Sequence, residues 1–246
     1  MTWFPIVLAH LLALLLIGLV PTRVLLLRLH ILHPLKPQPS WRLTYYFSNM
    51  VALWLEVCLL GIIGFDLNWS PQMLGLQFRT NISLAVFFIV LFLLGFLGFV
   101  LLQRQMLRNP QARAYARPLQ TTFPRTPKER WLFACLAFTA GIGEELLFRA
   151  FLPLYFTSIF PHCNSLLAIG LAALSFGIGH ISYGLPSVPI NGILGLLFSF
   201  LYLTTGSIFV PMIVHALFDL RVLLHDNASL LPQSEQGAEA TPSLLS

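Results

Sequence analysis

The residues best suited to chemistry form three short groups, and each group lies within an apolar segment. They are two adjacent acids with an arginine, a phenylalanine with a histidine, and a histidine with an aspartate: Glu144, Glu145 and Arg149; Phe176 and His180; His215 and Asp219. Only 9% of the chain is charged. A charged side chain at the centre of a membrane helix costs about 2.5–3.5 kcal/mol on insertion scales, so such residues are usually retained for function.

The two adjacent acids are predicted to play different parts. Glu145 and Arg149 are four positions apart, so on a helix they share one face in the order that favours an ion pair. This pair is predicted to brace the helix. Glu144 points about 100° away around the helix and has no basic residue three or four positions ahead. Burial disfavours the ionised form of such a carboxylate, which suits a general base or acid that works near neutral pH.

His180 is predicted to lie near Glu144 if the chain turns at residues 161–164. Glu144 lies 16 positions before Phe160, and His180 lies 16 positions after Asn164. Both residues are then about 24 Å along two antiparallel helices. The structural alternative is a histidine that simply bonds to a neighbouring helix.

His215 and Asp219 are also four positions apart. On one helix face, Asp219 could orient the imidazole by accepting its N–H, and a purely structural pair is the alternative. Glu56, inside another apolar run, could pair with a further helix or line a cavity.

The composition predicts an integral membrane protein with an all-α fold. Of the 246 residues, 57% are hydrophobic, and the mean hydropathy is +0.80. A soluble domain carries about a quarter charged residues. Seven of the fourteen Lys and Arg residues lie between Arg104 and Arg130. The net charge of +5 is therefore attributed to membrane topology and anionic lipid contact, and no nucleic-acid partner is expected.

Seven apolar runs predict a polytopic bundle of about seven spans: residues 3–20, 45–65, 84–102, 131–160, 165–181, 190–204 and 208–224. The run 131–160 would be about 45 Å long as one helix, against ~30 Å of hydrocarbon. A bend or break is therefore predicted at Gly141, Gly143 or Pro153. The expected organisation is N-terminal transmembrane helices over 1–103, a basic cytoplasmic loop over 104–130, a catalytic transmembrane core over 131–225 and a disordered tail over 226–246.

The charge distribution also predicts orientation. The connectors at 23–42 and 104–130 are basic, whereas the one at 66–83 holds a single basic residue, Arg79. The positive-inside rule then places the N-terminus outside and the C-terminus in the cytoplasm. The first apolar run has no basic residue ahead of it, so a retained helix is expected and not a cleaved signal peptide. We expect a multi-pass protein of the plasma (inner) membrane with the lipid bilayer as a partner.

The three motifs, in this order on successive apolar segments, resemble the CAAX protease and bacteriocin-processing (Abi) family of intramembrane proteases. The motifs are Glu-Glu-x-x-x-Arg at 144–149, Phe-x-x-x-His at 176–180 and His-x-x-x-Asp at 215–219, and the resemblance covers about residues 128–224. It implies peptide-bond hydrolysis within the bilayer. The branch that acts on prenylated proteins has Asn where this chain has Asp219, which argues against prenylated substrates.

The chemistry of these residues allows two versions of that reaction. In the first, Glu144 activates a water that His180 helps to hold, and His215, positioned by Asp219, stabilises the oxyanion. Glu145, Arg149 and Phe176 support the site. In the second, zinc is bound by Glu144, His180 and His215 with one open position for water. The expected cofactor is thus either none or zinc.

The competing class is a non-catalytic membrane protein, such as a transporter or an immunity-type scaffold, that uses the same buried polar residues. Transporters often contain internal repeats, and this sequence shows none. We therefore favour the protease, with a peptide or a membrane protein as its substrate. A bacteriocin-like peptide, a signalling peptide and a lipidated tail all stay open.

Overall fold

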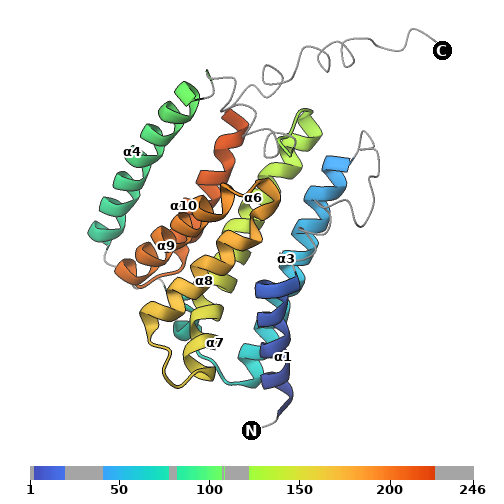
Figure 1. The fold of residues 1–246 in the computed structure, drawn as a ribbon, viewed down its shortest axis with the longest axis vertical. Helices are drawn as coiled ribbons and strands as arrows, with labels where there is room; N and C mark the ends of the chain where they lie inside the picture. Colours follow the sequence, from blue (N-terminus) through green and yellow to red (C-terminus); the bar gives the residue numbers. More distant parts are fainter. Residues whose placement is uncertain (1–2, 20–40, 78–81, 107, 109–121, 225–246) are drawn as a thin grey trace, which may run out of the picture.

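A computed structural model describes residues 3–19, 41–77, 82–106, 108 and 122–224. Every regular element within these ranges is helical (Figure 1), which confirms the predicted all-α fold. The predicted tail at 226–246 and most of the predicted basic loop lie outside the described residues.

The helices follow the predicted apolar runs closely. They are α1 (Trp3–Leu14), α3 (Trp41–Asp66), α4 (Ile82–Met106), α6 (Pro127–Glu145), α7 (Leu152–Ile159), α8 (Ser165–Gly179), α9 (Ser187–Thr205) and α10 (Phe209–Leu220). Short π-helical segments lie at Leu15–Leu19 and Leu146–Phe151, and short 3-10 segments lie at Pro71–Leu74, Ile181–Tyr183 and Arg221–Leu224.

The described residues contain four helices long and apolar enough to cross a membrane: Trp41–Asp66, Ile82–Leu102, Pro127–Ile159 and Ser187–Thr205. The protein is therefore a multi-pass membrane protein. The predicted number of about seven spans is not confirmed, because the apolar helices Pro5–Gly18 and Ser165–Gly179 are shorter. α10, with 12 residues, is only about 18 Å long and falls short of a ~30 Å hydrocarbon layer.

The ends of the helices are arranged as the positive-inside argument requires. Figure 1 shows the starts of α3 and α6 and the ends of α4 and α10 at one end of the bundle, and the start of α1 at the other. The end of α4 and the starts of α3 and α6, which adjoin the basic connectors, thus share one end. Which side of the membrane this end faces stays a prediction.

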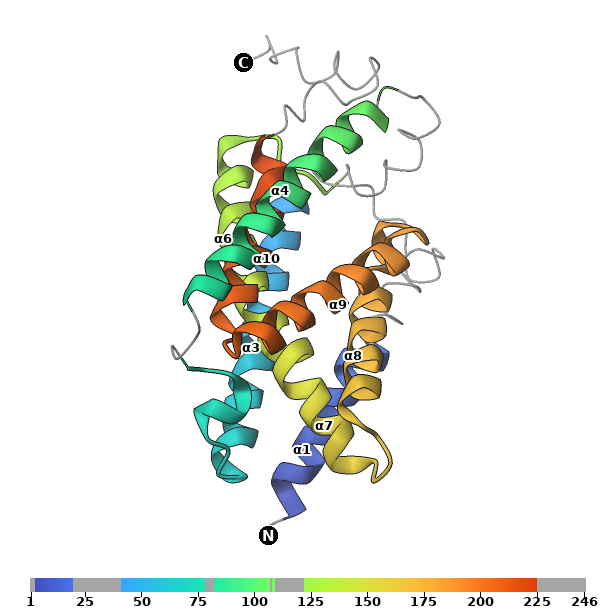
Figure 2. The same ribbon diagram turned by 90° about the vertical axis from the view of Figure 1, so that its left-hand side faces the viewer.

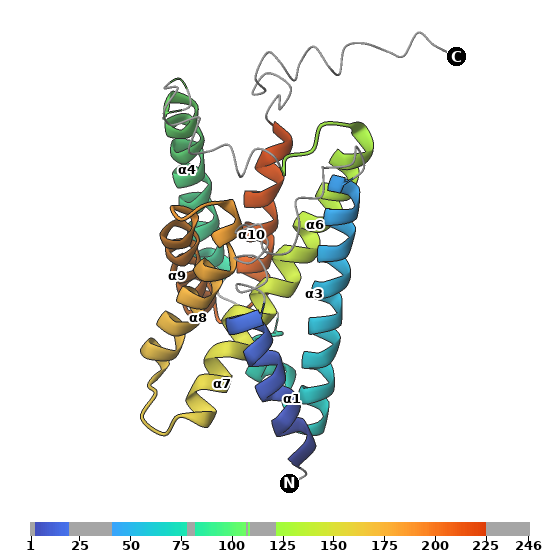
Figure 3. The same ribbon diagram turned by 45° about the vertical axis from the view of Figure 1, so that its right-hand side comes forward.

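α6 is the central element of the bundle. It packs against α3 on one side and α10 on the other (Figure 3), whereas α9 packs on α8 and runs obliquely to α6 and α10 (Figure 2). Thr126 and Glu129 form a capping box at its start, which satisfies backbone N–H groups that the first helical turn leaves unpaired. Arg42 of α3 lies 3.6 Å from the Glu129 carboxylate and ties the two helix starts together.

No break occurs at Gly141 or Gly143, because both glycines lie inside α6, whereas an irregular segment lies just before Pro153, the third position named. The irregularity begins a few residues after Gly143: α6, the π-helical segment and α7 form one continuous apolar helix, Pro127–Ile159. In the π-helical segment the N–H of Leu152 donates to the carbonyl of Leu147, five residues back. Pro153 follows immediately, and because proline lacks an N–H, an ordinary α-helical register could not be completed there.

Gly141 allows α6 to pack closely against α10. A Cβ at this position would lie 2.8 Å from the Met212 carbonyl oxygen and 3.0 Å from the Cβ of Ala216. The backbones of α6 and α10 are therefore in direct contact at Gly141, one helical turn before Glu145. At Gly143 a Cβ would lie 3.5 Å from Leu53 of α3, an ordinary contact.

The predicted turn between the helices that carry Glu144 and His180 is confirmed. α7 ends at Ile159 and α8 begins at Ser165. The side chain of Asn164 caps α8 by accepting a hydrogen bond of 2.9 Å from the Leu167 N–H. This short connection makes α7 and α8 neighbours and fixes the position of His180 at the end of α8.

Candidate active site

Glu145 and Arg149 form the predicted ion pair. The Arg149 Nε lies 3.2 Å from Glu145 Oε2, and both side chains are almost completely buried. The two terminal nitrogens of Arg149 have no hydrogen-bond partner among the described residues. The guanidinium instead lies over two aromatic rings, 4.1 Å from the centre of Phe176 and 5.2 Å from that of Phe198, where cation–π attraction offsets part of the cost of burial.

Glu145 also has a second partner that the sequence did not predict. Its Oε1 accepts a hydrogen bond of 2.7 Å from Nδ1 of His215 on α10. Asp219, the residue expected to orient His215, lies with Oδ2 at 3.6 Å from Nε2, beyond the distance of a hydrogen bond. The orientation of His215 is therefore determined by Glu145, and Asp219 faces the opposite nitrogen of the ring.

Glu144 lies on the other side of the same imidazole. Its Oε2 is 3.7 Å from His215 Nε2 and has no hydrogen-bond partner among the described residues. Glu144 also interacts electrostatically with His180 and with Glu56 of α3. The structure thus brings together the acid of the first motif and the histidines of the second and third motifs.

Phe176 and His180 complete the site from α8. His180 Nδ1 lies 2.8 Å from the Phe176 carbonyl oxygen. Because a carbonyl only accepts, Nδ1 carries a proton, and in the neutral ring Nε2 is left as an acceptor. The Phe176 ring lies 4.5 Å from the ring of His180 and 6.1 Å from that of His215, measured between centroids.

Phe198 of α9 is a residue of the site that sequence reasoning missed. Its ring stacks on His215 with a centroid distance of 5.0 Å and an interplanar angle of 21°. A phenylalanine within an apolar helix gives no sequence signal of such a contact. His215 is thereby held between a hydrogen bond on its edge and an aromatic ring on its face.

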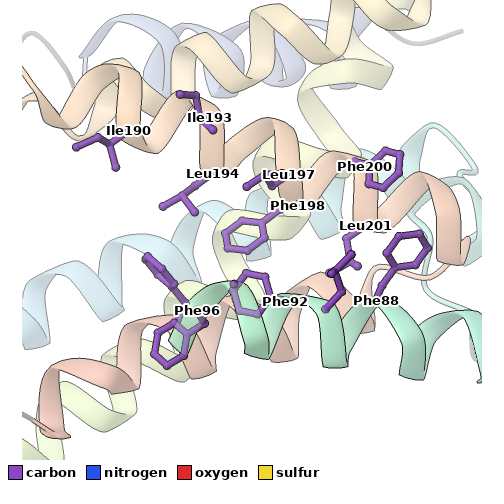
Figure 4. Close-up of a pocket in the computed structure, with 13 residues that line it drawn as sticks. Phe88, Phe92, Phe96, Ile190, Ile193, Leu194, Leu197, Phe198, Phe200 and Leu201 are labelled. Carbon is purple, nitrogen blue, oxygen red and sulfur yellow. The ribbon is translucent and has the colours of Figure 1, made fainter. Parts of the chain in front are cut away.

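An apolar pocket of about 500 Å³ is lined in part by Phe198. Figure 4 shows it between α4 and α9, with Phe198 pointing into it beside Phe92 of α4. Phe218 of α10 also lines it. Phe198 therefore has one contact with the imidazole of His215 and another with this pocket.

The side chains as arranged do not form a metal centre. Among the described residues, no group of three or more His, Cys, Asp or Glu side chains is placed to hold a metal ion. The zinc version with Glu144, His180 and His215 stays a prediction.

Comparison with known proteins supports the resemblance seen in the motifs. Residues 126–221 match the family model described as type II CAAX prenyl endopeptidase, Rce1-like. This range contains all seven residues of the three motifs. No curated protein and no solved structure shows a significant match. The family predicted from the sequence is thus confirmed for this part of the chain.

Proposed function

We propose, on the premise that residues 126–221 belong to the Rce1-like CAAX protease family, that the protein is an intramembrane endopeptidase. The observation that carries the proposal is the position of Glu144. Its carboxylate has an oxygen without a hydrogen-bond partner among the described residues, and this oxygen faces His215 Nε2 at 3.7 Å. An acid so placed can take a proton from a water molecule beside His215, which can stabilise negative charge on the carbonyl oxygen of the substrate.

In the proposed reaction the water oxygen attacks the carbonyl carbon of the scissile peptide bond while Glu144 takes one of its protons. His180 Nε2 accepts a hydrogen bond from the same water and orients it, because Nδ1 is already engaged with the Phe176 carbonyl. The bond to nitrogen then breaks, and Glu144 returns the proton to the leaving amine. The products are a carboxylic acid and an amine.

His215 is proposed to stabilise the oxyanion that forms on the carbonyl oxygen. In its protonated form it donates from Nδ1 to Glu145 and can donate from Nε2 to the oxyanion. Asp219, 3.6 Å from Nε2, is a counter-charge for that proton. The ion pair of Glu145 with Arg149 prevents Glu145 from turning away from the imidazole.

The substrate is proposed to place an apolar part in the pocket between α4 and α9. The pocket is lined by apolar residues alone, and its inner wall, Phe198, also contacts His215. A bulky apolar side chain next to the scissile bond would reach this pocket while the bond lies at the imidazole. A peptide or membrane protein with such a residue is the expected substrate.

The test is cleavage of a library of internally quenched apolar peptides by the purified protein in liposomes. Glu144→Gln keeps the size of the side chain but cannot accept the proton. We expect it to lower kcat by about 10²-fold or more without changing membrane insertion or Tm. Full activity in Glu144→Gln would contradict the proposal. Activity that survives complete removal of zinc by a chelator would rule out the zinc version.

A further inference from the structure

Two tyrosine hydroxyl groups meet beside the candidate site, and neither belongs to the three motifs. Tyr45 of α3 and Tyr183 of the 3-10 turn have their Oη atoms 3.1 Å apart. The Tyr183 ring lies 5.9 Å from the ring of His180. Tyr45 lies outside the family match, which covers residues 126–221, so the N-terminal half of the chain reaches the site through this contact.

Tyr183 is near the acids on both sides of the site. It interacts electrostatically with Glu144 and with Asp219, whereas Tyr45 interacts with Glu144. The turn that carries Tyr183 is held by Ser187, whose hydroxyl lies 2.5 Å from the carbonyl oxygen of His180. The backbone of the turn is therefore held against His180, and the Tyr183 N–H also donates to the His180 carbonyl at 3.0 Å.

In the proposed reaction His215 is the one motif residue assigned as a hydrogen-bond donor to the oxyanion. Oxyanion holes hold the developing charge with preorganised donors, and losing one donor typically costs about 10²–10³-fold in kcat. Glu144 and Asp219 cannot contribute as carboxylates, because a carboxylate only accepts hydrogen bonds. His215 has one nitrogen committed to Glu145 and so offers one donor. A neutral hydrogen-bond donor close to Asp219 would supply the hydrogen bond to the oxyanion that the carboxylate of Asp219 cannot.

A phenol meets this need at neutral pH, because its ordinary pKa of about 10 keeps its proton in place. In a pair of phenols one hydroxyl donates to the other. If Tyr45 donates to Tyr183, the Tyr183 hydroxyl group keeps its own O–H for a third group. The direction of this bond decides which tyrosine faces the substrate, and Tyr183 is the one in contact with His180.

We propose that Tyr183 is a catalytic residue that donates a hydrogen bond to the oxyanion of the tetrahedral intermediate, and that Tyr45 is a positioning residue that donates to Tyr183. Tyr183 keeps its proton throughout, so no bond of the phenol is broken. The inference rests on the proposed peptidase function and adds a residue pair that links α3 to its chemistry.

The test compares three single tyrosine-to-phenylalanine variants and one double variant in the peptide cleavage assay. We expect Tyr183→Phe to lower kcat about 10²-fold with little change in KM, as for the loss of one oxyanion donor. Tyr45→Phe should lower kcat less, and the double variant should match Tyr183→Phe alone, because Tyr45 acts only through Tyr183. Tyr46 is the matched control: it neighbours Tyr45 on α3, but its hydroxyl donates to the Thr122 carbonyl at 2.6 Å.

Each outcome decides the inference. Wild-type kcat in Tyr183→Phe, or a loss fully explained by a smaller folded fraction, would show that the hydroxyl is not catalytic. Additive losses in the double variant would refute the positioning role of Tyr45, and so would an equal loss of kcat per folded molecule in Tyr46→Phe. If the wild-type protein cleaves no peptide, the proposed function itself fails. If the wild type is active and Glu144→Gln is inactive, the proposed function stands. Wild-type activity in Tyr183→Phe would then refute only the role of the tyrosine.

Discussion

Gly141→Ala is the substitution whose effect follows most directly from the packing of α6 on α10. The added Cβ would lie 2.8 Å from the Met212 carbonyl oxygen and 3.0 Å from the backbone nitrogen of Ala216, whereas ordinary contacts begin at 3.4 Å. Backbone atoms cannot turn aside as a flexible side chain can. The two helices must therefore separate by about 0.6 Å, in an interior that is packed like a crystal.

This separation acts on the candidate site, because Glu145 follows Gly141 by one turn of α6 and His215 lies between Met212 and Ala216 on α10. The hydrogen bond between Glu145 and His215, now 2.7 Å, would lengthen to about 3.3 Å, past the usual limit for such bonds. Overpacking of a well-packed interior typically costs about 1–3 kcal/mol. A misplacement of 1 Å can cost about 10²-fold in rate, so we expect kcat/KM to fall by about tenfold or more.

Gly143→Ala is the matched control on the same helix. Its Cβ would meet the side chain of Leu53 at 3.5 Å, and replacing a glycine inside a helix by alanine usually stabilises by about 0.5–1 kcal/mol. We expect this variant to keep its activity and to have a Tm equal to or slightly above that of the wild type. The measurements are kcat/KM for peptide cleavage and thermal unfolding in detergent. If Gly141→Ala proves as active and as stable as Gly143→Ala, then the close contact of α6 with α10 does not align the site.

Two further predictions concern the surroundings of the site. Arg149→Met leaves the buried Glu145 without its counter-ion and should destabilise the protein by about 3–5 kcal/mol. The measurement is thermal unfolding, which should show a lower Tm. An unchanged Tm would refute the stabilising role of the ion pair between Glu145 and Arg149. Gly95 lines the apolar pocket, and a Cβ added there would meet no atom within 4 Å, so Gly95→Leu should fill the pocket and raise KM for peptides with a bulky apolar residue. Gly98→Leu, on the same helix with equally open space but outside the pocket lining, is its control, and equal KM values in the two variants would exclude the pocket as a substrate subsite.

The sequence predicts the elements of this fold better than their depth in the membrane. Each apolar run corresponds to a helix because apolar composition and turn-forming residues are local properties. The number of crossings depends on helix length, and α8 and α10 have only 15 and 12 residues. Hydropathy alone does not distinguish such a short apolar helix from a span. The helix does not break at Gly141, and the sequence could not show this, because a glycine that interrupts a helix and one that admits a neighbouring backbone look the same in a sequence.

The candidate site divides in the same way into local and long-range contacts. The ion pair of Glu145 with Arg149 follows from their spacing alone, and it is present. The hydrogen bond from His215 to Glu145 joins residues 70 positions apart. It depends on the position of α6 relative to α10 along the helix axis. Gly141, four positions before Glu145 on the same helix face, is the one sequence feature that could have indicated where the two helices meet. Nothing comparable marks Phe198.

The packing of these contacts supplies a physical reason for two adjacent acids to take separate roles. Glu145 is fully buried and has one oxygen toward His215 and the other toward Arg149, so taking up a proton from water would break contacts that hold the site together. The Glu144 side chain is 19% exposed, and its Oε2, which is buried, has no hydrogen-bond partner among the described residues. A base needs a side chain that water can approach and a carboxylate that is not held by short contacts, and Glu144 is the more exposed and the less tightly held of the two acids. The inner acid can therefore fix the imidazole in place while the outer acid exchanges protons beside it.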